Sequence, residues 1–142
     1  MVRVMASGVF DIIHTGHISY LQQARALGDE LVAVVACDDT VRRSKHEPVT
    51  PEGMRLKIVA CLKPVDAAIL GKVGDMLDTV AEVAPDIIVL GFDQGFDEGD
   101  LARRLAERGM GHIKVTRAAE SAEDLAATRR IIQRIRDLEG RE

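Results

Sequence analysis

Short apolar runs rich in β-branched residues recur along this chain, and stretches with helical periodicity separate them. The runs that predict strands cover Arg3 to Ser7, Leu31 to Ala36, Asp66 to Leu70, Asp86 to Leu90 and His112 to Thr116. The stretches that predict helices cover Gly16 to Leu27, Pro51 to Leu62, Asp75 to Ala84, Glu98 to Arg108 and about Ala122 to Leu138. This alternation predicts an α/β fold, namely a doubly wound, Rossmann-like parallel five-stranded sheet with helices on both faces.

The length of the chain limits the number of domains. A chain of 142 residues lies in the commonest size range for one domain, and it contains no internal repeat and no linker rich in Pro, Gly or Ser. We therefore expect a single domain over residues 1–142. In such folds ligands bind outside the carboxyl ends of the strands, so the loop after the first strand is the first place to search.

The charge balance excludes several classes of partner. A formal net charge of -4 provides no basic field for long nucleic acid, and aromatic residues at 3% are too scarce for a base-stacking platform. The sequence shows no signal peptide pattern and no apolar run near the ~20 residues of a membrane span. Cys37 and Cys61 are too few for a disulfide framework and lack metal-binding spacing. We expect a cytoplasmic protein that binds neither nucleic acid nor membrane.

The run from Gly8 to His17 joins the first strand to the first helix. Backbone N–H groups at a helix start lack intrahelical acceptors, and the helix dipole favours an anion there. Gly16 would let phosphate oxygens approach the backbone, and His14 and His17, three residues apart, can face one ligand. Imidazole N–H donors suit the charge that develops in phosphoryl or nucleotidyl transfer. Taken singly, each histidine could be a cap or a half-buried polar residue, and a zinc site would need a third ligand that the spacing does not offer.

The order glycine, aromatic, acid and then His-x-Gly-His resembles the signature of the cytidylyltransferase-like family of nucleotidyltransferases. Further similarity in Ser19 to Leu21 and Ala24 to Leu31 extends the match over the first helix. The resemblance implies that His14 and His17 bind the triphosphate and stabilise the pentavalent transition state. It also implies that Asp11 orders the loop, and that the nucleotide meets Gly8, Val9, Phe10, Thr15 and Gly16.

Two basic residues match family positions that hold the triphosphate or the acceptor phosphate. They are Lys45 and Arg55, and Arg55 lies in a stretch that resembles the family's short P-x-E-x-R-like segment. Either residue could instead be a solvated surface charge, and Arg42 or Arg43 could take the place of Lys45.

The strand expected to end at Leu90 is followed by polar residues at its carboxyl end. In relatives, similar G-x-D segments face the base and ribose, which implies a nucleotide-binding role for Gly91, Asp93 and Gln94. A turn stabilised by the Asp93 side chain is the structural alternative.

The last family motif is a cluster of Ser and Thr hydroxyls before a basic residue at a helix start. Here only Thr128 keeps a hydroxyl, and Arg129 supplies the charge that would neutralise the β and γ phosphates. Ser121 with Asp124 resembles a capping box that would begin the helix earlier and bury Thr128 on the face of Leu125, Ile132 and Ile135.

Three segments look most like the archaeal-type FAD synthases: Val34 to Val41, Leu62 to Gly71, and Ile88 to Glu98. This resemblance implies that the enzyme transfers AMP from ATP to the phosphate of FMN, giving FAD and pyrophosphate by in-line attack without a protein nucleophile. Mg²⁺ or another divalent cation would come bound with the nucleotide, and we assign no protein residue as a metal ligand. The flavin ring would need a mainly aliphatic slot, with Phe92 or Phe96.

Other functions stay open at this stage. One is a CTP-dependent cytidylyltransferase for glycerol 3-phosphate or ethanolamine phosphate, and another is an adenylyltransferase of the ADP-heptose type. A non-catalytic nucleotide-binding module is a different class, which the histidine pair disfavours. A Rossmann-type dehydrogenase is disfavoured because the first turn lacks G-x-G-x-x-G. The family also makes a homodimer plausible.

Overall fold

Five parallel strands form the centre of the protein, in the order β3-β2-β1-β4-β5. The structure is a computed structural model that describes residues 1–44, 47–123 and 125–141. Its strands are β1 (Arg3–Gly8), β2 (Glu30–Val35), β3 (Ala67–Leu70), β4 (Ile87–Leu90) and β5 (Lys114–Arg117). Every neighbouring pair is parallel, so the predicted α/β fold with a parallel five-stranded sheet is confirmed.

The helices lie between the strands, as the periodicity predicted. They are α1 (Thr15–Arg25), α2 (Asp38–Arg43), α3 (Glu52–Ala60), α4 (Met76–Val83), α5 (Glu98–Glu107) and α6 (Thr128–Glu139). The helix α2 was not predicted, because six residues are too few to show a period. Among the described residues, no helix is long and apolar enough to cross a membrane.

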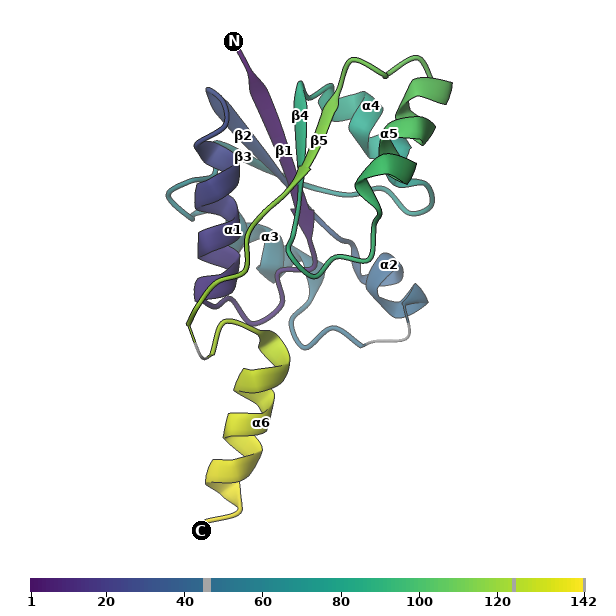
Figure 1. Cartoon of the computed structure of the whole chain (residues 1–142). Helices are drawn as coiled ribbons and strands as arrows, with labels where there is room; N and C mark the ends of the chain where they lie inside the picture. The colour runs from purple at the N-terminus through teal and green to yellow at the C-terminus, as the bar shows by residue number, and fades with distance from the viewer. Residues whose placement is uncertain (45–46, 124, 142) are drawn as a thin grey trace.

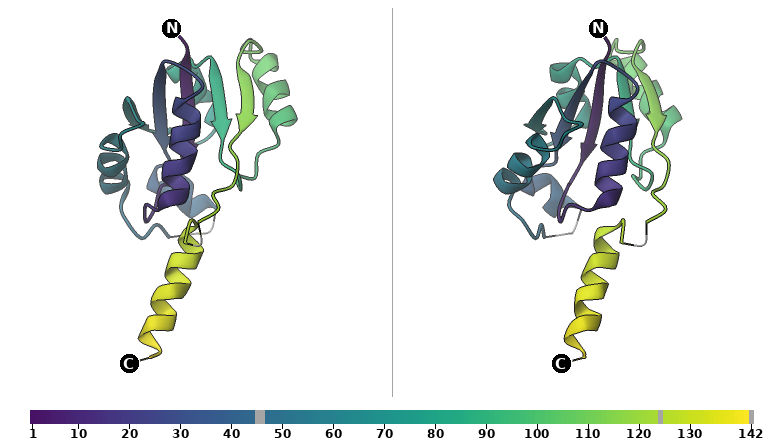
Figure 2. Two further views of the ribbon diagram at one scale, coloured as in Figure 1. Left: turned by 60° about the vertical axis from the view of Figure 1, so that its left-hand side comes forward. Right: turned by 90° about the vertical axis from the view of Figure 1, so that its left-hand side faces the viewer.

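Helices cover both faces of the sheet (Figures 1 and 2). The central strand β1 alternates its side chains between the two faces, so Val4 and Ala6 belong to one core cluster and Met5 to the other. The first cluster contains residues of α1 and α3, and the second contains residues of α4 and α5. Because β1 is buried on both faces, it reads as a continuous apolar run.

The reversal of strand order places the ligand-binding edge. The chain moves from β1 outward to β2 and β3, and then returns to the other side of β1 with β4 and β5. The crevice at such a reversal, outside the carboxyl ends of β1 and β4, is where open α/β sheets bind ligands. The segments that follow β1 and β4 therefore form the candidate site.

The last helix, α6, leaves this edge of the sheet and extends away from the body of the protein (Figures 1 and 2). None of its described residues is buried. It begins at Thr128, so the expected start near Ala122 is wrong. Ala127 is the N-cap and makes no side-chain capping bond, while the Ser121 hydroxyl accepts a bond from the N–H of Glu123 in a separate turn. Asp124, the other half of the expected capping box, lies outside the described residues.

Candidate functional site

The turn after β1 has an unusual backbone. Phe10 and Ile12 both adopt the left-handed region, with φ of 55° and 51°. Each such non-glycine residue costs roughly 1–2 kcal/mol, so the surrounding contacts must hold the turn in place. The ring of Phe10 is 2% exposed and anchors the turn in the core.

Asp11 ties this turn to the segment before α3. Its carboxylate accepts hydrogen bonds from the N–H of Val49 (2.6 Å), the N–H of Thr50 (3.0 Å) and the hydroxyl of Thr50 (2.6 Å). Burial opposes ionisation of the carboxyl, but the bonds from Thr50 and Val49 together outweigh it and lower the pKa of Asp11. The prediction that Asp11 orders the loop is confirmed.

Arg55 holds the other side of the same turn. Its side chain is 0% exposed, and its guanidinium donates to the carbonyls of Thr50 (3.0 Å), Val9 (2.7 Å) and Ala36 (2.7 Å) and to the carboxylate of Asp38 (2.7 Å). These bonds use four of the five N–H donors of an arginine. The expectation that Arg55 binds an acceptor phosphate is therefore corrected, because its donors already fix the turn after β1 and the end of β2.

Replacing Arg55 should destabilise the fold. In Arg55→Met, three carbonyls and Asp38 lose a buried charged partner, and we expect the free energy of unfolding to fall by roughly 3–5 kcal/mol. Urea denaturation measures the change. Arg103→Met is the matched control, because Arg103 makes ion pairs on α5 with a side chain that is 62% exposed, and it should change stability by less than ~1 kcal/mol. Equal midpoints for the two variants would contradict the role given to Arg55.

His14 is the N-cap of α1, and His17 completes a capping box with it. The Nδ1 of His14 accepts from the N–H of Gly16 (3.1 Å), and the Nδ1 of His17 accepts from the N–H of His14 (3.2 Å). Their rings stack with centroids 3.8 Å apart. A neutral imidazole carries one N–H, so acceptance at Nδ1 places the proton of each ring on Nε2. The capping role and the ligand role weighed from the sequence are thus compatible in one geometry.

Both imidazoles are held in the neutral form. Burial lowers the pKa of His14, against an opposing effect of the Asp93 carboxylate. Burial, reinforced by the nearby His14, lowers the pKa of His17 from 6.5 to about 4. Near pH 7 the pair therefore offers two hydrogen-bond donors without carrying charge.

The lowered pKa of His17 predicts a pH dependence of stability. Below about pH 6.5 the unfolded chain protonates this histidine, whereas the folded protein does not until about pH 4. The free energy of unfolding should therefore fall by roughly 2 kcal/mol between pH 7 and pH 5, at ~1.36 kcal/mol per unit. His17→Asn, whose side-chain oxygen can still accept from His14, should lose most of that slope in urea denaturation at the two pH values. An unchanged slope would contradict the neutral, buried state of His17.

Gly16 is required for a reason that the sequence did not reveal. A Cβ at this position would lie 2.5 Å from the carbonyl oxygen of Ala126 and 2.8 Å from the ring of His14. The glycine therefore admits the segment before α6 and the capping imidazole.

Three cavities lie side by side along the carboxyl edge of the sheet. The first, of about 380 Å³, lies between the histidine pair, the loop after β4 and the start of α6. The second, of about 430 Å³, shares His17, Asp93 and Thr128 with the first. The third, of about 580 Å³, shares Gly8, Val9 and Gln94 with the second and extends toward α4.

Most of the predicted site residues meet in these cavities. The residues that line them are Gly8, Val9, Phe10, His14, Gly16, His17, Gly91, Asp93, Gln94, Thr128 and Arg129. Thr15 is exposed at the start of α1 and lies outside the three cavities. Arg55, which is buried, lies outside them too. Lys45 lies outside the described residues.

Thr128 occupies the start of α6 instead of an apolar helix face. Its hydroxyl donates to the carbonyl of Asp11 (3.1 Å), so the start of α6 is tied to the turn after β1. The expectation that a longer helix would bury Thr128 is wrong, because this tertiary bond lies at the first turn of α6. The N–H groups of that turn and Arg129 thus lie at the first cavity.

Tyr20 is a site residue that the sequence reasoning missed. Its hydroxyl donates to the carbonyls of Val89 (2.5 Å) and Ser7 (3.2 Å) and accepts from the N–H of Ser7 (3.0 Å), so it joins β1 to β4 beneath the first two cavities. Burial raises the pKa of Tyr20, which keeps its proton in place. Its position three residues after His17, on the same helix face, was the available signal.

Comparisons with known proteins agree with this geometry. Residues 5–134 match the family described as Cytidylyltransferase-like. An FAD synthase of Aciduliprofundum boonei is 54% identical over 138 residues, which are 96% of this chain and 92% of that protein. An FAD synthase of Thermoplasma acidophilum is 51% identical over 140 residues, or 99% of this chain and 98% of that protein. A crystal structure described as the lipopolysaccharide core biosynthesis protein from Thermoplasma volcanium GSS1 is 51% identical with a TM-score of 0.83, covering 85% of this chain and 98% of its own.

Proposed function

The chain belongs to the cytidylyltransferase-like family and is similar to FAD synthases over nearly its whole length, and on that premise we propose that it transfers AMP from ATP to the phosphate of FMN. The products would be FAD and pyrophosphate. The observation that carries the proposal is the neutral histidine pair with its two Nε2–H donors, which lines the first cavity together with the start of α6.

We place the triphosphate of ATP in the first cavity. The first turn of α6 supplies backbone N–H groups and the positive end of its dipole, and Thr128 and Arg129 add a hydroxyl and a charge. His14 and His17 line the same cavity. Asp93, in the loop after β4, lines the same cavity, and its carboxylate would accept hydrogen bonds from the ribose or the base.

The reaction needs positioning and charge stabilisation more than covalent chemistry. A phosphate oxygen of FMN would attack the α-phosphorus of ATP in line, while the bond from the α-phosphorus to the bridging oxygen breaks and pyrophosphate leaves with that electron pair. The Nε2–H groups of the histidine pair would donate to the oxygens on which the charge increases. No protein side chain would form a covalent bond to the substrate.

The carboxylates of the site fit a divalent cation that is carried by the nucleotide. Within residues 1–44, 47–123 and 125–141, no three His, Cys, Asp or Glu side chains are grouped so as to hold a metal ion. Mg²⁺ in phosphate sites commonly keeps its waters and uses one or two carboxylates. Asp93, which lines the first and second cavities, is the carboxylate that would hold the cation. Such a cation would neutralise charge on the phosphate oxygens.

We place the flavin ring of FMN in the third cavity. Its wall contains the apolar side chains of Val34, Met76 and Phe96, which suit a flat ring. The cavity shares Gly8 and Gln94 with the second one, so the acceptor phosphate would reach the reaction centre from there. Of the two phenylalanines considered from the sequence, Phe96 lines this cavity, whereas Phe92 lines the first one.

An adenylyltransferase of the ADP-heptose type is the second candidate. The observation that favours it is the description of the Thermoplasma volcanium structure as a lipopolysaccharide core biosynthesis protein. The third cavity is also lined by Lys72, Asp75 and Arg104, which a sugar phosphate could use, but the two similar FAD synthases cover more of this chain than that structure does.

We also propose that two copies of the chain associate through α6. This helix leaves the body of the protein, and Ile135 and Leu138 on it are 50% and 44% exposed. With Ile131, they form a stripe at helical spacing that a second α6 would cover.

A substrate panel tests the proposed reaction. Pyrophosphate release should be fastest with ATP and FMN, among combinations of ATP or CTP with FMN, glycerol 3-phosphate, ethanolamine phosphate and heptose 1-phosphate. His14→Ala and His17→Ala should each lower kcat by roughly 10²–10³-fold with the fold intact, because each removes one donor to the developing charge. Circular dichroism checks the fold.

His112→Ala is the matched control for the two variants, because His112 is exposed and lies outside the cavities. Near-normal release by either active-site variant would contradict the mechanism. Tight ATP binding without release for any acceptor would favour the non-catalytic binding module.

Substitutions of Phe92 and Phe96, in the loop after β4, should affect the binding of different substrates. Phe96→Ala should raise KM for FMN about tenfold and leave KM for ATP unchanged, because Phe96 lines the third cavity. Phe92→Ala should affect only KM for ATP. Steady-state kinetics with each substrate varied in turn measures both constants, and a shift of the same KM in both variants would refute the assignment of the cavities.

A further inference from the structure

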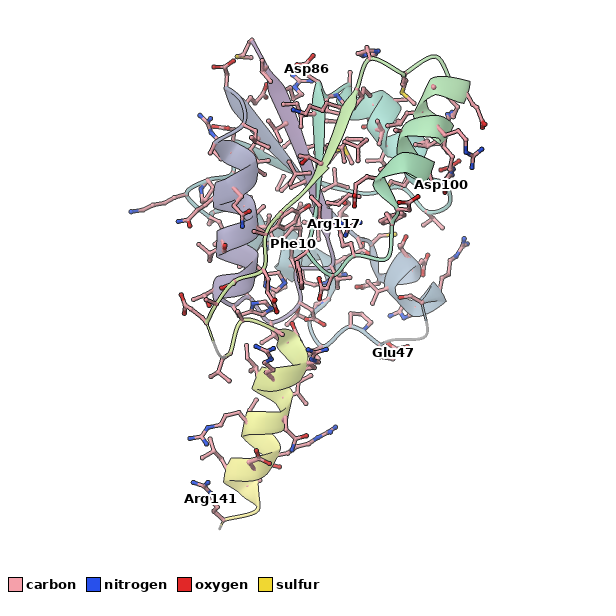
Figure 3. The ribbon with its side chains drawn as sticks, viewed as in Figure 1. Phe10, Glu47, Asp86, Asp100, Arg117 and Arg141 are labelled. Atoms are coloured by element: carbon pink, nitrogen blue, oxygen red, sulfur yellow. The ribbon has the colours of Figure 1, made fainter. Side chains whose placement is uncertain are left out.

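Arg117, at the carboxyl end of β5, points toward the loop between β4 and α5 (Figure 3). Its Nη1 donates to the carbonyls of Gly91 (2.9 Å) and Gln94 (2.8 Å) and, at 3.4 Å, to that of Phe92. Its Nη2 donates to the carbonyl of Phe96. One guanidinium therefore meets four carbonyls spread along residues 91–97.

The same side chain fixes the far end of the loop. The Nε of Arg117 donates to the carboxylate of Glu98, the first residue of α5, and forms an ion pair with it. The Arg117 side chain is 25% exposed and that of Glu98 is 43% exposed, so the pair stays partly open to water. Charge-assisted bonds of this kind are stronger than neutral ones, and the planar fork of arginine suits several acceptors at fixed angles.

The loop that Arg117 holds forms part of every cavity of the site. Phe92 and Asp93 line the first cavity, Asp93 and Gln94 line the second, and Gln94 and Phe96 line the third. A displacement of this loop would move the walls of the nucleotide and acceptor cavities together.

The side chain of Gln94 forms a second anchor, which joins the loop to β1. It accepts from the N–H of Gly91 (2.7 Å) and donates to the carbonyl of Ser7 (2.8 Å). Asp97 caps α5 through the N–H of Asp100. Arg117 binds the carbonyls of Gln94 and Phe96, which lie at or between these two anchors.

We propose that Arg117 is a positioning residue that sets the separation between the nucleotide cavity and the acceptor cavity by clamping residues 91–97. Its guanidinium lies outside the three cavities and acts through the loop. A lysine cannot replace it, because one ammonium cannot reach carbonyls as far apart in the chain as Gly91 and Phe96 while also pairing with Glu98. The kinetic consequence rests on the proposed function, whereas the clamp itself does not.

Hydrogen exchange tests the clamp without reference to any reaction. In Arg117→Ala, the amides of Gly91 and Gln94, which donate hydrogen bonds within the loop, should exchange about tenfold faster or more, while those of β1 and β2 keep their protection. Arg117→Lys should give most of the same effect although it keeps the charge. Arg103→Ala is the matched control, because Arg103 pairs with Asp100 and Glu107 on the surface of α5 and none of the three lines a cavity. Unchanged exchange in the loop of both Arg117 variants would overturn the proposal.

Kinetics then tests the consequence for the site. Arg117→Ala should raise KM for ATP and KM for FMN together by about tenfold or more, in contrast to a change of one wall residue. Guanidinium chloride at a low, non-denaturing concentration should restore part of the affinity, and sodium chloride at equal ionic strength should not. Faster loop exchange with no reaction for FMN in the wild type would leave the clamp standing and reject the acceptor. A loosened loop with both KM values unchanged would overturn the proposed role in spacing the cavities.

Discussion

The buried guanidinium of Arg55 is the interaction on which the geometry of this site depends. It binds carbonyls at the end of β2, in the turn after β1 and in the segment before α3. Asp11 adds a second tie between the same turn and Thr50, and its own carbonyl receives the hydroxyl of Thr128. Hydrogen bonds to charged groups are worth roughly 1.5–3 kcal/mol each, which is the scale needed to hold two left-handed residues at ~1–2 kcal/mol apiece.

The chemistry follows from this fixed turn. Because the turn places His14 before α1, the two histidines cap the helix through Nδ1 and keep their protons on Nε2. Burial holds them neutral with one proton each, so a triphosphate would accept a hydrogen bond from each Nε2–H. The same turn accepts the hydroxyl of Thr128, which ties the start of α6 to the cavity that the histidines line. One turn thus positions both the histidine pair and the start of α6.

Local patterns in the sequence predicted those features that depend on neighbours in the chain. The parallel sheet followed from apolar runs, and the histidine pair followed from its spacing beside a helix start. Features decided by distant contacts were missed or mistaken. In the sequence Arg55 cannot be told from a surface arginine on a helix, because its partners Val9, Ala36 and Asp38 are distant in the chain. The start of α6 is set at Thr128, whose bond to Asp11 spans 117 positions, and no capping pattern could reveal this. Arg117 likewise acts on a loop more than 20 residues earlier in the chain.

The central claim is that the turn after β1 presents two neutral imidazoles, protonated at Nε2, to the phosphates of a nucleotide. Nitrogen-15 NMR of the histidine side chains, with and without a non-hydrolysable ATP analogue, tests it directly. The account predicts that His14 and His17 are both Nε2-protonated tautomers near pH 7, and that both Nε2–H signals shift when the analogue binds while those of His112 do not. Nδ1-protonated or charged rings in the free protein, or a bound analogue that leaves both signals unmoved, would contradict it.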